Sequence, residues 1–185
     1  MDYNLKFSNQ LKDGQKGEIA IMQYLAKKGY KLIHFNDTMD YDILLEKNGI
    51  ETTVEIKTDR YETLKGFKTN NLFLEVMCNG KASGVIGTKA IYFIYYYPDY
   101  EKCYMITINE LRHLLQYQPG LFIRKSHSGD KGRVTGYVIN RDIAKNYFKV
   151  IDIPMENWEW ANDYYERKKR EFENSLKNPN NICHL

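Results

Sequence analysis

Residues 41–57 read YDILLEKNGIETTVEIK, and this stretch decides the fold. Residues 41–46 and 51–57 are two strand candidates, and in the second of them apolar side chains alternate with polar ones. The Asn-Gly pair between them, at positions 48–49, is a strong turn signal of a β-hairpin. The sequence therefore predicts two neighbouring antiparallel strands in this part of the chain.

The second of these strands sorts its side chains onto two faces, because successive side chains of a strand alternate. Glu55 and Lys57 project from one face, while Val54 and Ile56 project from the other, where a core would take them. Closing the hairpin brings Asp42 beside Glu55. We therefore expect two carboxylates and one ammonium group to meet at one place.

These residue types suit hydrolysis of a phosphodiester, which needs a hard cation, a water that can lose a proton and a positive group near the developing charge. We expect Asp42 and Glu55 to bind Mg²⁺ or Mn²⁺. Magnesium usually takes one or two carboxylates and fills its other positions with water and substrate phosphate. Lys57 could position or deprotonate the attacking water, or it could stabilise the pentacovalent phosphate as a cation. The sequence leaves both roles open.

An acidic residue further upstream completes a pattern. The series Glu18, Asp42 and Glu55-Ile56-Lys57 resembles the PD-(D/E)xK nuclease superfamily, which includes restriction endonucleases, Holliday junction resolvases and phage nucleases. In that family a helix with a glutamate precedes three antiparallel strands, of which the second carries the aspartate and the third the E-x-K. Here a helical stretch over about residues 11–28 carries the glutamate, and residues 30–35 are the first strand candidate.

The resemblance covers about residues 13–97, and it departs from the family in two places. Tyr41 stands where the family usually has a proline, and the segment after Lys57 does not read clearly as its crossover helix. The resemblance implies an α/β fold with a restriction-endonuclease-like core, in which helices flank a mixed central β-sheet.

The resemblance also implies a function, namely metal-dependent hydrolysis of DNA phosphodiesters. Asp42 and Glu55 would be metal ligands, the Ile56 main-chain carbonyl would complete the coordination, Lys57 would act on the water or the charge, and Glu18 would be an auxiliary acid. No organic cofactor is implied. Three alternatives stay open: a structure-specific enzyme such as a junction resolvase, an enzyme that acts on RNA, and a binding module without turnover.

Some of the acidic residues have competing interpretations. Asp40 competes with Asp42, because residues i and i+2 share one face of a strand. Glu18 could instead favour the positive end of a helix dipole. Glu75 lies in another strand-like run and could add a ligand or merely face solvent.

The charge is segregated along the chain. Residues 124–149 contain seven Lys or Arg residues and two acidic ones, whereas residues 150–175 contain seven acidic residues and four basic ones. This pattern fits a face that binds the DNA backbone and an opposite, solvated or partner-binding end. The candidate phosphate contacts are Lys65, Lys68, Lys89, Lys131 and Arg133.

With 185 residues, of which 43% are hydrophobic, and with no linker or repeat, the chain is expected to form one nuclease domain over residues 1–185. Its expected parts are a core over about residues 13–97, a basic β/α extension over residues 98–153 and a C-terminal helix within residues 154–185. We also expect a loop over residues 58–71, next to the site, and a flexible basic loop over residues 126–133.

Other classes of protein are disfavoured. No run approaches the ~18 to 20 apolar residues of a membrane span, and the polar start lacks the apolar region of a signal peptide. We therefore expect a soluble, cytoplasmic protein. The three cysteines and four histidines have no zinc-ligand spacing. Because an enzyme that cuts duplex DNA generally needs one active site for each strand, a homodimer is a reasonable hypothesis.

Overall fold

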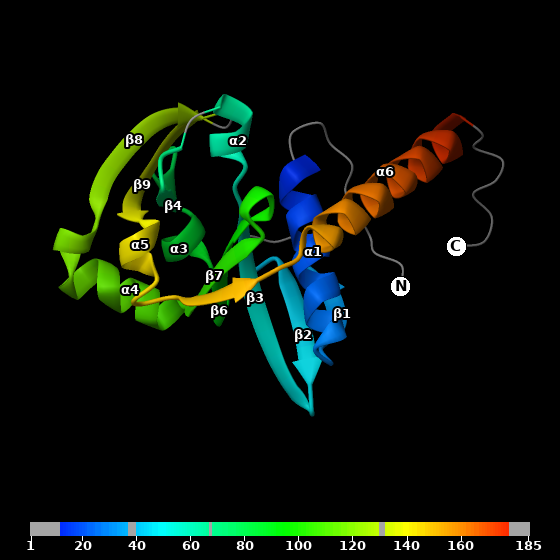
Figure 1. The fold of residues 1–185 in the computed structure, drawn as a ribbon, viewed down its shortest axis with the longest axis horizontal. Helices are drawn as coiled ribbons and strands as arrows, with labels where there is room; N and C mark the ends of the chain where they lie inside the picture. The colour runs from blue at the N-terminus through cyan, green and yellow to red at the C-terminus, as the bar shows by residue number, and fades with distance from the viewer. Residues whose placement is uncertain (1–11, 37–39, 67, 130–131, 178–185) are drawn as a thin grey trace.

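The computed structural model describes residues 12–36, 40–66, 68–129 and 132–177. Its central feature is a six-stranded sheet with the strand order β1-β2-β3-β6-β7-β10 (Figure 1). Strands β3 and β6 are parallel, and all other neighbours in this sheet are antiparallel. The predicted mixed central sheet is confirmed. Its strands are β1 (Lys31–Phe35), β2 (Ile43–Lys47), β3 (Ile50–Thr58), β6 (Tyr92–Tyr97), β7 (Lys102–Thr107) and β10 (Lys149–Asp152).

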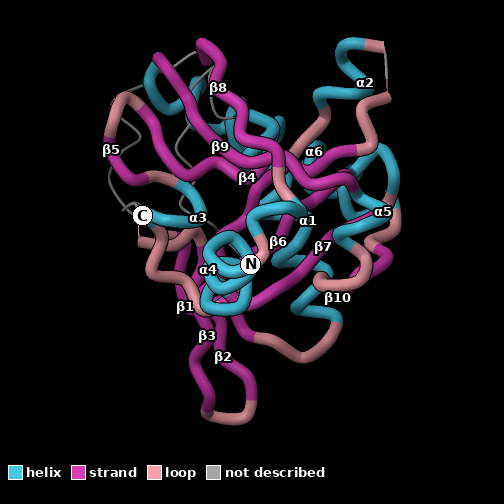
Figure 2. Tube along the Cα trace, turned by 90° about the vertical axis from the view of Figure 1, so that its left-hand side faces the viewer, coloured by secondary structure: helices cyan, strands magenta, loops and turns pink. Residues whose placement is uncertain are grey.

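A second sheet, which the sequence did not predict, has four antiparallel strands in the order β5-β4-β9-β8. In Figure 2 its strands cross the upper part of the molecule, and the β2–β3 hairpin projects at the bottom. The expected flexible loop over residues 126–133 is wrong where the structure describes it, because residues 126–129 and 132–133 pair as strands. The strands are β4 (Asn71–Cys78), β5 (Lys81–Ala82), β8 (Ile123–Gly129) and β9 (Gly132–Asn140).

Helices flank the six-stranded sheet, as expected for the α/β class. Helices α1 and α6 lie side by side, and α6 projects beyond the rest of the molecule (Figure 1). The expected loop over residues 58–71 contains the short helix α2, so this expectation is wrong in part. The helices are α1 (Lys12–Lys27), α2 (Tyr61–Lys65), α3 (Gly84–Gly87), α4 (Ile108–Tyr117), α5 (Arg141–Ala144) and α6 (Met155–Lys177), with 3₁₀ turns η1 (Pro98–Tyr100) and η2 (Pro119–Leu121).

Two buried clusters lie on opposite faces of the six-stranded sheet. Val54 and Ile56 belong to the cluster that includes residues of α1 and α6. Phe93 belongs to the other cluster, which includes residues of α4 and of the second sheet. Glu55 pairs with Phe93 across β3 and β6, and paired residues share one face. Glu55 and Lys57 therefore project toward the side of the second sheet, and the predicted alternation along β3 is confirmed.

Close packing of α1 against β3 depends on Gly17. A Cβ atom at this position would overlap the Thr58 hydroxyl and lie 2.8 Å from the Thr58 Cβ. Glu18 is the next residue of the helix, and Thr58 is the last residue of β3. The contact at Gly17 therefore fixes how closely Glu18 approaches the strand that carries Glu55.

We expect Gly17→Ala to lower the free energy of unfolding by about 1–3 kcal/mol, because the added methyl group overpacks this contact. Gly14→Ala, in the same helix, is the matched control. A Cβ at Gly14 meets nothing within 4 Å, so better helix propensity should raise stability by about 0.5–1 kcal/mol. Urea unfolding followed by circular dichroism measures both variants. Changes of the same sign in the two variants would contradict the packing argument.

Candidate active site

Hydrogen bonds hold Asp42, which lies just before β2, against β3. Its main-chain N–H donates to the Val54 carbonyl at 3.0 Å, and its Oδ2 accepts from the Ile56 N–H at 2.6 Å. The carboxylate of Asp42 is therefore fixed next to Glu55 and Ile56, where the hairpin argument expected it. Coordination of a metal by the Ile56 carbonyl stays a prediction.

The pKa values of three carboxyl groups show that they lie close together in a poorly solvated place. Burial, and then the charges of Asp42 and Glu55, raise the pKa of Glu18 to about 8. Burial also raises the pKa of Asp42 to about 6, although the Ile56 N–H and the charge of Lys57 act in the opposite direction. The charges of Asp42 and Glu55 thus make Glu18 harder to ionise.

The pKa of Glu55 is raised as much as that of Glu18. Burial, and then the charge of Asp42, raise its pKa to about 8, against a hydrogen bond with the Thr88 side chain and the charge of Lys57, which lower it; Glu75 raises it further. The structure therefore brings Glu18, Asp42, Glu55 and Lys57 together, although they come from α1, from the residue before β2 and from β3. Thr88 was missed, because nothing in its local sequence distinguishes it.

The donor set fits a hard divalent cation of low protein coordination number. Within the described residues no group of three or more His, Cys, Asp or Glu side chains is arranged to enclose a metal ion. Magnesium does not need such an enclosure, because one or two carboxylates with water and phosphate suffice. Asp42 and Glu55 would supply those carboxylates. A cation beside them would also offset the burial that raises both pKa values and the charge of Asp42 that raises the pKa of Glu55.

Without metal, we expect the free energy of unfolding to fall as the pH rises from about 4.5 to about 8. The folded state favours the protonated forms of Glu18 and Glu55, so it binds more protons than the unfolded state across this window, and stability must decrease with pH. Denaturant unfolding at several pH values, in EDTA and in Mg²⁺, measures the effect. Added Mg²⁺ should reduce the loss, and a flat profile in EDTA would contradict the raised pKa values.

The structure also places Asp40 and Glu75, the two carboxylates whose roles the sequence left open. Asp40 forms an ion pair with Lys89 at 3.1 Å, and its main-chain carbonyl accepts hydrogen bonds from the Lys89 N–H and the Thr88 hydroxyl. Asp42, and not Asp40, is the aspartate that acts on Glu18 and Glu55. Glu75, on β4, lies near Glu55 of β3, and its Oε1 accepts a hydrogen bond from the Ser83 hydroxyl at 2.6 Å.

The basic residues predicted to contact phosphates have different environments. Lys65, Lys68 and Arg133 are exposed, and none of them forms an ion pair with a described residue. Lys89 is also exposed, but it is paired with Asp40. Lys131 lies outside the described residues. Sequence reasoning did not single out Arg124 and Lys125, which are exposed on β8.

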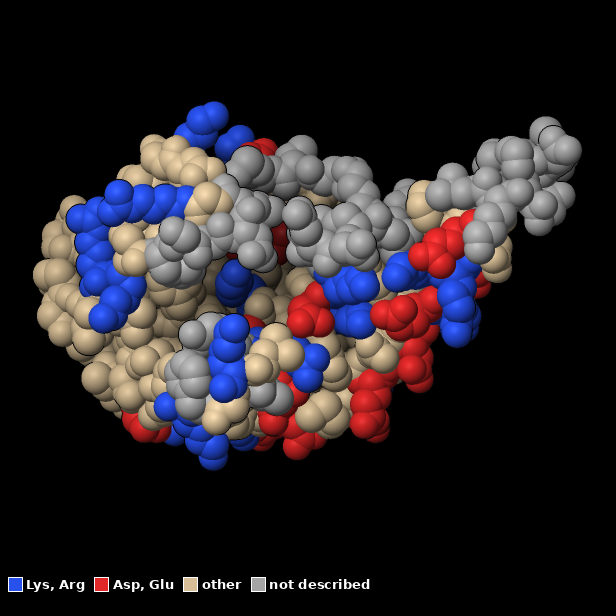
Figure 3. Space-filling model, turned by 90° about the horizontal axis from the view of Figure 1, so that it is seen from above, with Lys and Arg blue, Asp and Glu red and all other residues tan. Residues whose placement is uncertain are grey.

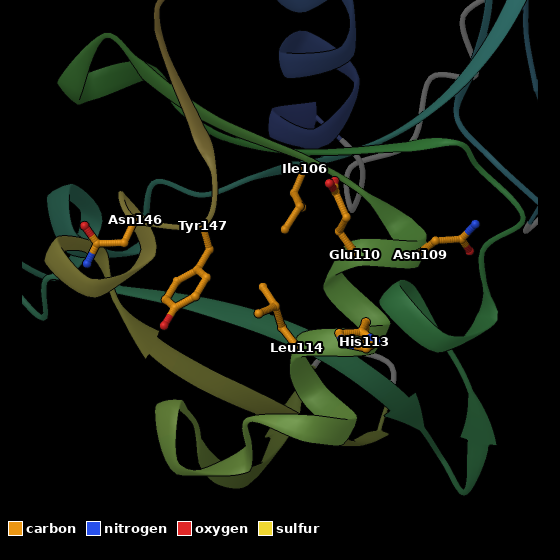
Figure 4. A pocket seen from close by; sticks show the side chains of 7 residues that line it. All are labelled: Ile106, Asn109, Glu110, His113, Leu114, Asn146 and Tyr147. Atoms are coloured by element: carbon orange, nitrogen blue, oxygen red, sulfur yellow. The ribbon is translucent and has the colours of Figure 1, made fainter.

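An open cavity of about 500 Å³, which none of the candidate site residues lines, lies between α4 and the segment that precedes β10 (Figure 4). One of its polar groups is engaged within the fold. Glu110 accepts a hydrogen bond from the Thr107 hydroxyl at 2.7 Å in the capping box that begins α4. The cavity therefore adds no group to the acidic site. Its lining residues are Ile106, Asn109, Glu110, His113, Leu114, Asn146 and Tyr147.

Comparisons with known proteins found a structural neighbour but no family. No family model matches the chain, and no curated protein matches it. Among solved structures, the chain is similar to a bacterial homing endonuclease, I-Ssp6803I, with 18% sequence identity, a TM-score of 0.46, and coverage of 88% of this chain and 99% of that chain. These values are too low for the likeness to bear on function. In the described part of the chain, no helix is long and apolar enough to cross a membrane.

Proposed function

We propose that this protein is a metal-dependent nuclease that hydrolyses DNA phosphodiester bonds. The observation that carries the proposal is the gathering of Glu18, Asp42, Glu55 and Lys57 at one point, with the pKa values of all three carboxyl groups raised. Such a cluster of carboxylates lowers the stability of the fold, and strongly shifted pKa values are concentrated at functional sites. The resemblance of the residue order to the PD-(D/E)xK superfamily supports the same function.

Each residue of the site would have a role that follows from its environment. Asp42 and Glu55 would hold Mg²⁺ or Mn²⁺, which would polarise the phosphate and lower the pKa of a bound water. Glu18, with a pKa near 8, can take up or release a proton close to neutral pH. Lys57 is exposed beside Glu55 and offers a positive charge to the phosphate that is cut. The Ile56 carbonyl would supply one further oxygen.

The test is a cleavage assay on labelled linear duplex, single strand, flap, four-way junction and RNA, each in Mg²⁺, Mn²⁺ or EDTA. We expect metal-dependent cutting of DNA that is lost in both Glu55→Gln and Lys57→Ala. Preference for the junction would indicate a structure-specific resolvase, and preference for RNA would change the substrate class. No cutting of any substrate, with binding unchanged in both variants, would overturn the proposal and leave a binding module.

We also propose that the enzyme acts as a homodimer, because two strands of a duplex need two sites. Sedimentation at several protein concentrations, with and without duplex DNA, tests this assembly. A monomer under all these conditions, combined with cutting of both strands, would contradict it.

A further inference from the structure

The second sheet carries unpaired positive charge next to the candidate active site. Its strands hold four basic residues, Lys81, Arg124, Lys125 and Arg133, and one acidic residue, Glu75, among the described positions. All four basic side chains are exposed, and none is in an ion pair with a described residue. In Figure 3 basic side chains form an arc over the left-hand part of the molecule, which a hollow separates from the right-hand part. Such an excess of charge suits a polyanion.

Strand register places one of these cations in a row with Glu75. Lys125 is directly opposite Gly136, and Gly136 is directly opposite Glu75, so all three lie on one face of the sheet. Two strand spacings separate Lys125 from Glu75, which is about 10 Å. A Cβ at Gly136 would lie 2.6 Å from the Cζ of Phe73, so the aromatic ring covers the glycine. Between the two charged residues, this face therefore has no side chain at Gly136 and presents the ring of Phe73.

The neighbouring cation, Arg124, belongs to the opposite face. It pairs with Tyr137, which pairs with Leu74, and both partners belong to the buried cluster under the second sheet. The exposures of the preceding residues agree, because Phe122 is 9% exposed on the side of Arg124, and Ile123 is 61% exposed on the side of Lys125. Two adjacent residues of like charge thus mark the two faces of one strand.

The face that bears Lys125 begins at the candidate active site. Glu75, at one end of the row, accepts a hydrogen bond at 2.6 Å from the hydroxyl of Ser83, the N-cap of α3, and the side chain of Thr88, the C-cap of α3, is hydrogen-bonded to Glu55. The charge of Glu75 acts on Glu55, which places the start of the row beside the proposed metal ligands. A strand of nucleic acid lying on this face would therefore be continuous with a phosphate at Lys57.

We propose that the Lys125 face of the second sheet binds the DNA strand that continues from the phosphate to be cut, with Lys125 contacting a phosphate within about three nucleotides of Glu75 at a rise of ~3.4 Å per nucleotide. This inference rests on the proposed nuclease function. Charge complementarity selects the occupant, because the face offers the unpaired ammonium group of Lys125 to a phosphate of the DNA backbone.

The test compares Lys125→Ala with Arg124→Ala, each in the Glu55→Gln background so that the DNA is not cut. The dissociation constant for labelled duplex DNA is measured over a range of salt concentrations. We expect Lys125→Ala to weaken binding about 5- to 10-fold at low salt and to reduce the slope of log K against log salt by about one. Arg124→Ala removes the same charge from the other face and should change neither quantity.

Each result separates this inference from the proposed function. An equal effect of the two variants, or an effect of Arg124→Ala alone, would overturn the assignment of the face while leaving the nuclease activity intact. Unchanged binding in both variants would do the same. A Lys125-specific effect in a protein whose wild type cuts no substrate would support the binding face and overturn the nuclease function. Thermal unfolding of both variants confirms that an exposed substitution has not altered the fold.

Discussion

Glu55→Gln is expected to lower Mg²⁺-dependent DNA cleavage about 10³-fold and, without metal, to make the protein more stable. The amide is a poorer ligand for a hard cation than the carboxylate, and loss of comparable electrostatic groups lowers rates by about 10²- to 10³-fold or more. Burial and the charge of Asp42 raise the pKa of Glu55 to about 8. The neutral amide removes that unfavourable charge, for a gain of about 1–3 kcal/mol in unfolding free energy at neutral to alkaline pH.

Glu51→Gln is the matched control for this prediction. Glu51 lies on the same strand but is exposed, and no shift in the pKa of Glu18, Asp42 or Glu55 is caused by it. The control should change neither cleavage nor stability. Cleavage by Glu55→Gln at the wild-type rate would reject Glu55 as a ligand. Loss of cleavage together with loss of stability would instead indicate that the carboxylate holds the fold.

The part of the site that the sequence predicted depends on short-range signals. The turn at Asn48 and Gly49 has φ values of 55° and 78°, which an Asn-Gly pair adopts readily, and the alternation along β3 then fixes the faces. The position of Asp42 follows from closing this hairpin. Gly17 shows where such reasoning stops, because its importance arises from Thr58, which is distant in sequence.

The second sheet and the helix α2 could not be predicted, each for a physical reason. Residues 123–129 are mostly polar, since β8 is an edge strand whose described side chains are largely exposed, so they lack the apolar signal of a buried strand. Main-chain pairing with β9 holds them in place instead.

Residues 58–71 read as a loop because they are polar, yet Glu62 among them is only 4% exposed. Its partners come from remote parts of the chain.

Glu62 and Arg141 form a buried ion pair that joins the crossover after β3 to the end of β9. Arg141 Nη2 lies 2.8 Å from Glu62 Oε2, and the guanidinium lies over the rings of Tyr97 and Tyr100 at 4.8 and 4.6 Å from their centroids. Burial alone would raise the pKa of Glu62, but hydrogen bonds from Thr69, Tyr100 and two main-chain N–H groups lower it to about 2. The fold therefore stabilises the ionised form of Glu62.

We expect Arg141→Met to lower the free energy of unfolding by about 3–5 kcal/mol, because it leaves the carboxylate of Glu62 buried without its countercharge. Lys145→Met, at the residue that follows α5, is the control, because its ion pair with Asp142 is exposed and should contribute little to stability. Denaturant unfolding measures both variants. Adding Glu62→Gln to Arg141→Met should restore part of the loss, because the buried charge is then gone.

The pH dependence separates this ion pair from the acidic site. The pKa of Glu62 is lowered in the folded state, so its contribution is present above the ordinary pKa of about 4.5 and is lost as the pH falls toward about 2. The carboxylates at the site act in the opposite direction, at higher pH. Arg141→Met should therefore move the acid-induced loss of stability to higher pH and leave the decrease between about 4.5 and about 8 unchanged. A change confined to that upper window would show that Arg141 acts through the site and not through Glu62.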